Sequence, residues 1–200
     1  MNREEWNERY AAAEDLLWSA APNRTLEAEV ADLARGRALD LACGEGRNAV
    51  WLAQQEWDVT AVDFSDVAVA RGRNLARRRG VTVHWVVEDV YEFEPETAAF
   101  ELVIVLYLHV PAPARGEILR RAGSALALGG TLLVLGHDVS NLEGGYGGPS
   151  DASILYSPDD LAADVPALHI VKAEHVHREV ETEEGRRVAI DALLRATRAR

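Results

Sequence analysis

The sequence predicts a single α/β domain built around a doubly wound, mostly parallel β-sheet. Its 200 residues suit one domain of ordinary size. Short apolar runs alternate with stretches whose apolar residues recur at helical spacing, which is typical of a parallel sheet with helices on both faces. The apolar runs are nearly continuous, as expected for strands that meet water on neither face.

Five apolar runs are expected to form the parallel strands, and three stretches between them are expected to be helices. The helices are expected to end before Trp57, at Gly80 and at Gly129-Gly130, because glycine readily adopts the left-handed conformation that stops a helix. The expected strands span residues 38–42, 59–62, 81–87, 102–106 and 131–135, and the helices span 48–55, 67–79 and 115–128.

The two ends of the chain differ from this pattern. Residues 3–34 resemble an amphipathic helical extension, and the polar, glycine-rich residues 140–157 predict a long flexible loop. Two further strand-like runs, 169–180 and 187–197, are joined by the charged segment 181–185, and so short a connection predicts an antiparallel hairpin. We therefore expect one domain over residues 1–200, with 1–34 as a helical lid and 35–200 as the α/β core.

Composition excludes several classes of partner. The formal net charge of −12 disfavours nucleic acid and anionic membrane surfaces. The single cysteine, Cys43, fits a reducing compartment, and the polar N-terminus lacks the apolar region of a secretory signal. The longest apolar run, Leu102 to Leu108, is too short to span a membrane. We expect a cytoplasmic monomer or homodimer with a small-molecule substrate.

The first expected strand leads into a glycine turn with an acidic residue before it. Ligands of doubly wound sheets bind outside the carboxyl ends of the strands. Gly44 and Gly46 allow the backbone to pass close beneath a ligand, where a Cβ atom would collide with it. Asp40 is placed to hold a cationic amino group, directly or through water.

Two more acidic residues end the next two expected strands. Asp63 is placed to accept hydrogen bonds from both hydroxyls of a ribose, and Asp89 from an exocyclic adenine amine, while the Val90 N–H can donate to the ring. Either aspartate can instead be an ordinary helix N-cap. Three carboxylates at three successive strand ends nevertheless predict a nucleoside ligand, and they are stronger evidence than a single glycine turn.

A nicotinamide-binding Rossmann domain is the nearest alternative. Such a domain needs a third glycine where Ala49 stands. Glu45 within the turn would repel a diphosphate but is harmless beside an uncharged linkage. The turn therefore favours a nucleoside without a pyrophosphate.

The run Leu39–Asn48 (LDLACGEGRN) resembles motif I of the class I S-adenosylmethionine-dependent methyltransferases, and more narrowly the tellurite-resistance and thiopurine-methyltransferase-like group. The resemblance covers essentially the whole chain. It implies a seven-stranded sheet in the order 3-2-1-4-5-7-6 with strand seven antiparallel, S-adenosylmethionine as cofactor and S-adenosylhomocysteine as product. The cofactor contacts it implies, together with those we add from the lid and from the fourth strand, are Trp6, Tyr10, Asp40, Gly44, Gly46, Asn48, Asp63, Phe64, Asp89, Val90 and Leu106. Ala42 stands where the group usually has its first glycine, and we expect it to be tolerated with a negative φ.

Methyl transfer from a sulfonium is an in-line displacement, so the protein must mainly align the acceptor and exclude water. A base is needed only if the acceptor arrives protonated. Tyr107 and His109 follow the fourth expected strand, and His137 and Asp138 follow the fifth. His137 with Asp138 can be an oriented base, or Asp138 can merely cap the loop.

The hairpin supplies a second set of candidates. In the resemblance group a His-Arg pair, a short turn and an arginine handle an oxyanion, and the matching residues here are His177, Arg178 and Arg187, with Arg186 competing for the last place. The longer, acidic turn puts that anion preference in doubt. The arginines can instead pair with the neighbouring glutamates on the surface.

The other histidines and aromatics are assigned as follows. His169, His175 and His177 share one face of an expected strand, but their spread along it predicts no metal site. Trp6 and Tyr10 are expected to cover the pocket as a lid with Trp18 near the substrate, although aromatics at helical spacing are usually core. Trp51 and Trp57 are expected in the core. The predicted function is methyl transfer to a heteroatom of a small molecule, with a non-catalytic nucleoside-binding module as the alternative from another class.

Overall fold

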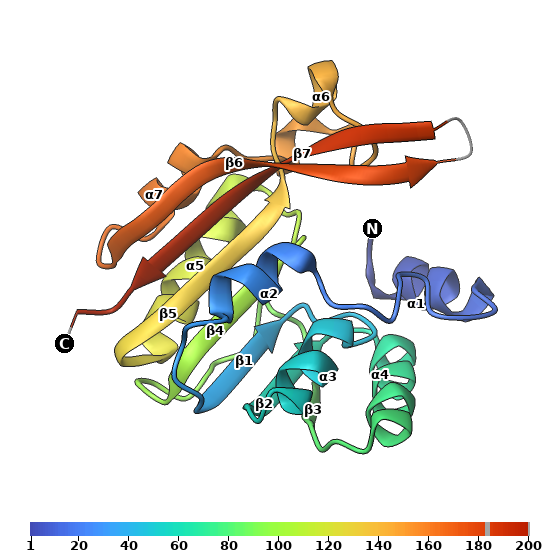
Figure 1. Cartoon of the computed structure of the whole chain (residues 1–200), viewed down its shortest axis with the longest axis horizontal. Helices are drawn as coiled ribbons and strands as arrows, with labels where there is room; N and C mark the ends of the chain where they lie inside the picture. Colours follow the sequence, from blue (N-terminus) through green and yellow to red (C-terminus); the bar gives the residue numbers. More distant parts are fainter. Residues whose placement is uncertain (183–184, 200) are drawn as a thin grey trace.

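Five parallel strands and a C-terminal antiparallel hairpin form one seven-stranded sheet in the order β3-β2-β1-β4-β5-β7-β6 (Figure 1). The computed structural model describes residues 1–182 and 185–199. The strands are β1 Arg37–Leu41, β2 Asp58–Asp63, β3 His84–Val87, β4 Phe100–Leu106, β5 Leu126–His137, β6 His169–Thr182 and β7 Gly185–Thr197. β7 pairs antiparallel with both β5 and β6, so the predicted order and strand directions are confirmed.

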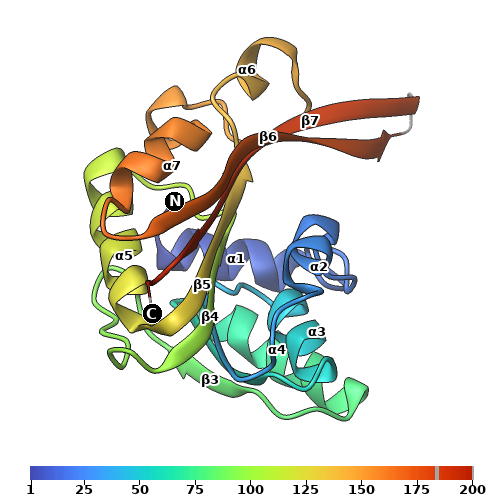
Figure 2. The same ribbon diagram turned by 60° about the vertical axis from the view of Figure 1, so that its left-hand side comes forward.

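Helices cover both faces of the sheet (Figure 2). The helices are α1 Arg3–Ala12, α2 Arg24–Val30, α3 Arg47–Gln54, α4 Asp66–Arg79, α5 Ala112–Ala125, α6 Asn141–Gly144 and α7 Pro158–Asp164. The apolar side chains of α2, α3 and α4 pack on one face, and those of α5 and α7 pack on the other. Alternate residues of β1 and β4 enter the two cores, which explains why both strands read as unbroken apolar runs.

The N-terminal extension is not one helix but two. An irregular segment over residues 13–23 separates α1 from α2, and Asn23 caps α2 by accepting from the N–H groups of Thr25 and Leu26. Asn2 caps α1 in the same way, because its side-chain oxygen accepts from the Glu5 N–H. The Glu5 carboxylate in turn accepts from the backbone N–H of Asn2.

The prediction for Gly129-Gly130 was wrong. These glycines lie inside β5, which begins at Leu126, whereas α5 ends at Ala125. A Cβ at Gly130 would come within 2.8 Å of the Phe100 carbonyl oxygen, so the glycine permits the close approach of β4.

The polar segment after β5 carries more local structure than predicted. It contains α6 and a 3₁₀ turn over Ala152–Ile154, and the buried Asn141 side chain ties it down by accepting from Ile190 N and donating to the Gly147 carbonyl. Helix α7 follows directly, started by Ser157, Pro158 and Asp160 as a capping box with proline in the first turn. We did not recognise that start signal in the sequence.

The hairpin extends well beyond the rest of the sheet (Figures 1 and 2). Pairing between β5 and β7 reaches only to His137 and Asp191, whereas β6 and β7 remain paired out to Thr182 and Gly185. Both strands are longer than predicted. Glu183 and Glu184 of the predicted charged turn lie outside the described residues. In the described part of the chain, no helix is both long enough and apolar enough to cross a membrane.

Candidate functional site

The turn from β1 to α3 reverses the chain through three residues in the left-handed region. The φ angles are 58° at Ala42, 55° at Gly44 and 71° at Gly46, which is the N-cap of α3. The expectation of a negative φ at Ala42 was wrong, because this turn requires the conformation that the more usual glycine adopts without strain. The space that Gly46 leaves is filled by protein, since a Cβ there would lie 2.2 Å from the Trp85 ring.

Asp40 lies in β1 immediately before this turn and is almost fully buried. Its Oδ2 atom has no hydrogen-bond partner in the described part of the chain. Burial, and then the nearby charge of Asp63, raise the pKa of Asp40 to about 8. A buried carboxylate oxygen without a donor is costly alone, so this position fits a ligand that brings a cationic donor such as an ammonium group.

Asp63 ends β2, next to the strand of Asp40, and Asp89 follows β3, so the three carboxylates lie at the carboxyl ends of three successive strands of the sheet, as predicted. Asp63 Oδ2 accepts from Gly44 N at 2.7 Å and its Oδ1 accepts from Ser65 N at 2.9 Å. Burial raises the pKa of Asp63. Asp89 is half-buried and accepts from Tyr91 N at 3.0 Å. Neither aspartate is the helix N-cap that was the alternative, because Ser65 caps α4 and the chain after Asp89 forms a turn.

The other predicted cofactor residues surround this edge. Phe64 and Val90 are half-buried after β2 and β3, and Leu106 is buried at the end of β4. Asn48 has a structural partner, because its side-chain oxygen accepts from Asn23 N at 2.9 Å. That bond links α3 to the N-terminal segment.

The N-terminal segment lies against the motif I turn. Tyr10 is buried, and a Cβ at Gly44 would lie 3.0 Å from its hydroxyl oxygen. The Trp6 ring stacks on Tyr10 with a centroid separation of 5.4 Å. Trp18 is 46% exposed, and its backbone N–H donates to Glu45 Oε2 at 3.4 Å. The structure therefore brings all three aromatic residues next to the predicted cofactor site.

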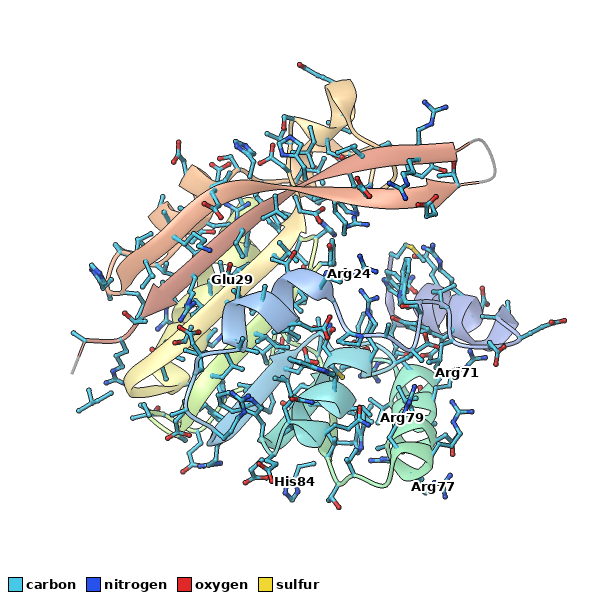
Figure 3. All side chains as sticks on the ribbon, in the orientation of Figure 1. Arg24, Glu29, Arg71, Arg77, Arg79 and His84 are labelled. Carbon is cyan, nitrogen blue, oxygen red and sulfur yellow. The ribbon has the colours of Figure 1, made fainter. Side chains whose placement is uncertain are left out.

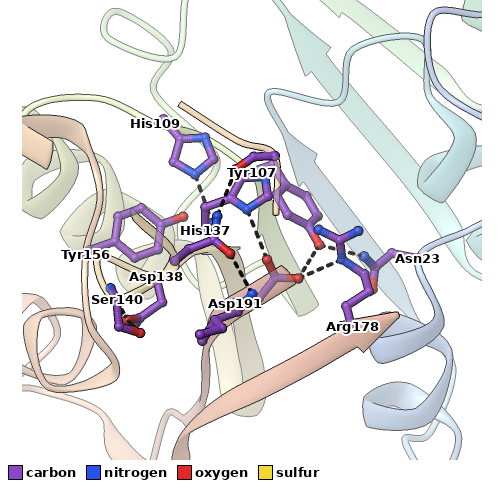
Figure 4. A network of polar contacts seen from close by, with 12 residues as sticks. Asn23, Tyr107, His109, His137, Asp138, Ser140, Tyr156, Arg178 and Asp191 are labelled. Carbon is purple, nitrogen blue, oxygen red and sulfur yellow. Dashed lines mark hydrogen bonds and ion pairs between the residues drawn. The ribbon is translucent and has the colours of Figure 1, made fainter. Parts of the chain in front are cut away.

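A second polar cluster occupies the carboxyl ends of β4 and β5 and the neighbouring part of β7 (Figure 4). At its centre is Asp191, which is completely buried. Asp191 Oδ2 accepts from the Tyr107 hydroxyl at 2.7 Å and from Arg178 Nε at 2.9 Å. Asp191 Oδ1 lies 3.3 Å from His137 Nδ1. The carboxylate that faces His137 is thus Asp191, and not its chain neighbour Asp138.

Asp138 has the capping role that was the alternative in the sequence. Its Oδ1 accepts from both the N–H and the hydroxyl of Ser140, at 2.8 and 2.6 Å. Its Oδ2 lies 3.2 Å from Nε2 of the exposed His175, on the opposite face of the sheet from His137.

The hairpin separates the residues that we grouped. His177 is exposed and pairs with Ile190, so the alternation of β6 places it on the opposite face from Arg178. Arg186 pairs with Glu181 and contacts Glu179 and Glu181 on the surface, which is the alternative that we weighed for the arginines. Arg187, opposite Val180, shares the face of Arg178 farther along the hairpin.

Four residues of this region were missed in the sequence: Asp191, Asn23, Tyr156 and Arg47. Asp191 stands alone among apolar residues of β7, and a lone charge inside an apolar strand is the signal that could have found it. Asn23 donates to the Tyr107 hydroxyl at 3.2 Å. The Tyr156 ring stacks on His109 at 5.7 Å.

Arg47 begins α3 on the cofactor side of this cluster. Among the described residues it makes no ion pair, and its hydrogen bond goes to Ser19 Oγ at 3.5 Å. Burial lowers the pKa of Arg47, while the nearby Tyr107 raises it. No three His, Cys, Asp or Glu side chains in the described ranges are grouped to hold a metal ion.

Comparison with known proteins places this geometry in a family context. Residues 38–130 match the methyltransferase domain family. A ubiquinone biosynthesis O-methyltransferase of Xanthomonas euvesicatoria is 32% identical over 106 residues, which cover 52% of this chain and 44% of that protein. The chain spans less than half the length of the curated relatives it matches.

Two solved structures extend the likeness over the whole chain. The 1,6-didemethyltoxoflavin-N1-methyltransferase of Burkholderia thailandensis, with bound 1,6-didemethyltoxoflavin and S-adenosylhomocysteine, has a TM-score of 0.73 at 22% identity, covering 99% of this chain and 87% of that one. TehB of Haemophilus influenzae has a TM-score of 0.75 at 14% identity, covering 98% of this chain and 66% of that one. At these identities the likeness establishes the fold.

Proposed function

We propose that this chain, which belongs with the class I S-adenosylmethionine-dependent methyltransferases, transfers the methyl group of S-adenosylmethionine to a heteroatom of a small molecule. Its fold and the sequence of residues 38–130 are the premise of this proposal. The observation that carries this proposal is the buried, unpartnered Oδ2 of Asp40 beside the motif I turn. The ammonium group of the cofactor would supply the missing donor there. Asp63 would accept from its ribose and Asp89 from its adenine.

When bound, the cofactor supplies an activated methyl group on a sulfonium. The protein's part is then to hold acceptor and donor in line and to keep water out. Tyr10, Trp6 and Trp18 are placed to close the site from the N-terminal side. The ends of β4 and β5, with Tyr107, His109 and His137, are placed to receive the acceptor.

The proposal includes the setting of the reaction. We infer that residues 1–200 form a single methyltransferase domain, which is present as a monomer or homodimer in the cytoplasm. A small-molecule acceptor is supported by what the matched proteins are named for, and a nucleic acid is disfavoured by the net charge of −12.

Calorimetry with S-adenosylhomocysteine and with NADH, followed by a product assay over a panel of phenols, thiols and nitrogen heterocycles, tests the proposal. We expect S-adenosylhomocysteine to bind, NADH not to bind, and at least one acceptor to be methylated. Preferential binding of NADH would favour the oxidoreductase alternative. Binding without turnover of any acceptor would favour a nucleoside-binding module.

A further inference from the structure

We propose that His137 is the general base that takes the proton of the methyl acceptor, and that Asp191 is the positioning residue that orients its imidazole. This inference rests on the proposed methyl transfer and narrows its acceptors to those whose nucleophilic atom arrives with a proton, such as a phenolic hydroxyl or a ring N–H. Neither residue is part of the cofactor-binding turn.

His137 lies at the same edge of the sheet as that turn, with one strand between them. β1 pairs with β4 and β4 pairs with β5, so the end of β5 lies two strand spacings, roughly 10 Å, from the motif I turn. Tyr107, at the end of β4, occupies the strand between. A base at this position can therefore face an acceptor whose other side faces the transferred methyl group.

The two ring nitrogens of His137 have different surroundings. Nδ1 is buried and lies 3.3 Å from Asp191 Oδ1, and neither atom has a hydrogen-bond partner elsewhere in the described residues. The 3.3 Å contact falls short of hydrogen-bond geometry, so a small turn of the ring would complete it. With Nδ1–H directed at the carboxylate, Nε2 carries the lone pair that can accept a proton.

The neighbouring groups are committed to other contacts. His109 Nε2 accepts from the backbone N–H of His137 at 3.1 Å, and burial lowers the pKa of His109 to about 4. The Tyr107 hydroxyl donates to Asp191 and accepts from Asn23, and burial raises its pKa. Asp191 itself has no exposed surface. His137 keeps 14% of its side chain exposed, so it can meet a ligand.

The charge on His137 follows from the groups that face it. They are Asp191 on β7, Arg178 on β6, and Tyr107 and His109 after β4. Burial lowers the pKa of His137, Asp191 raises it and Arg178 lowers it, with a net lowering. The imidazole is therefore neutral at neutral pH and able to act as a base. Asp191 then stabilises the imidazolium that forms.

The step balances without a further reactant. The acceptor heteroatom forms a bond to the methyl carbon, the carbon–sulfur bond pair passes to sulfur, and the acceptor proton passes to His137 Nε2. After the product leaves, His137 loses this proton to water and is neutral again. Proton-free nucleophiles such as iodide would need no such base.

The first test follows the ring signals of His137 by NMR through a pH titration and needs no acceptor. Asp191→Asn should lower the pKa of His137 by about one pH unit or more, because a carboxylate within ion-pair distance is lost. Arg178→Gln should raise it, and this second variant serves if Asp191→Asn fails to fold. His84→Gln, at the outer edge of the sheet, is the control and should leave it unchanged. A His137 pKa unmoved by both test variants would overturn the proposal.

The second test measures turnover of an acceptor found in the panel. His137→Gln should lower kcat/KM at pH 7 about 10²- to 10³-fold, with S-adenosylhomocysteine affinity within about twofold of wild type. The loss should shrink at high pH, where a phenol ionises without help. A loss below threefold, a loss independent of pH, or an enzyme that methylates iodide but no protonated acceptor would overturn the base while leaving methyl transfer intact. Failure to bind S-adenosylhomocysteine would instead overturn the proposed function.

Discussion

Asp40 and Asp63 are neighbouring buried carboxylates whose hydrogen bonding differs in the ligand-free chain. Asp63 already accepts from two backbone N–H groups, whereas Asp40 keeps one oxygen without a donor. The first is thus fixed in place by the turn that it helps to shape. The second is the carboxylate that we propose the ligand's ammonium group satisfies.

Asp63→Ala should weaken S-adenosylhomocysteine binding by about 1.5–3 kcal/mol, because two ribose hydroxyls would lose a charged acceptor. Calorimetry measures the change, and thermal unfolding reports whether the turn survives. Asp58→Ala, at the exposed start of the same strand, is the matched control. Unchanged affinity in a folded Asp63→Ala protein would rule out the ribose role.

Cofactor affinity should rise with pH between about 6 and 8. The pKa of Asp40 is raised to about 8 by burial, so the free protein holds this carboxyl largely protonated at neutral pH. Since an ammonium ligand requires the ionised form, binding lowers that pKa and releases a proton. Calorimetry in buffers of different ionisation enthalpy detects the release. Asp40→Asn should bind more weakly and without a linked proton, and a pH-independent wild type would contradict the assignment.

Ala42→Gly should stabilise the fold by about 0.5–1 kcal/mol, because a φ of 58° strains alanine more than glycine. Urea unfolding measures the difference. Ala49→Gly, inside α3, should change stability in the opposite direction and serves as the control. Equal destabilisation by both substitutions would mean that Ala42 is not held in the left-handed region.

At the scale of elements, Arg71 of α4 links the N-terminal segment to the motif I turn (Figure 3). Arg71 donates to the carbonyls of Ala13 and Asp15, at 2.6 and 2.5 Å, and to Glu45 of the motif I turn at 3.2 Å. Asn7 adds a bond to Asp66 at the start of α4. The segment that carries Trp6, Tyr10 and Trp18 is thereby coupled to the turn that we assign to the cofactor.

Arg71→Ala should increase hydrogen exchange over residues 10–18 without loss of the sheet, and turnover should fall more than cofactor affinity. Arg78→Ala, at the exposed end of the same helix, is the control. Deletion of residues 1–18 should also abolish turnover while the sheet stays folded, because β1 begins only at Arg37. Exchange over residues 10–18 that stays the same in Arg71→Ala would mean that other contacts hold the segment.

At the scale of the whole molecule, the sheet determines where chemistry can occur. Parallel strands β1 to β4 end at one edge, and the antiparallel β7 enters the same edge with Asp191 opposite His137. The cofactor half and the acceptor half of the proposed site are thus built by different strands of one sheet. The hairpin beyond Asp191 extends past this edge, with Arg178 and Arg187 on the side that faces the site.

The protein should not bind DNA or RNA at about 150 mM salt, because a net charge of −12 repels phosphate backbones. Retention on immobilised single- and double-stranded oligonucleotides measures this, with a basic protein of similar size as the positive control. Salt-sensitive retention near physiological ionic strength would contradict the small-molecule acceptor.

The sequence alone was sufficient to predict the parallel sheet and the carboxylates at the edge to which we assign the cofactor. Continuous apolar runs separated by helical periods predict a parallel sheet, and Asp40, Asp63 and Asp89 lie at or just after the ends of three of its strands. The motif and its three carboxylates are local in the chain, so the sequence alone could place them at one edge, where ligands of such sheets bind. The order of the strands came from the resemblance to a known family. Errors at Gly129-Gly130 and in residues 140–157 arose where a local glycine signal competed with pairing or capping that it does not reveal.

Only the tertiary structure decided which side chains contact one another where we propose that the acceptor binds. His137 was paired with Asp138 because they adjoin in sequence, but strand alternation turns adjacent side chains to opposite faces, and the carboxylate opposite His137 comes from β7. The same alternation separates His177 from Arg178 and distinguishes Arg186 from Arg187, once the hairpin register is known. Register depends on contacts between residues far apart in the chain, and local patterns in a single sequence do not reveal those contacts.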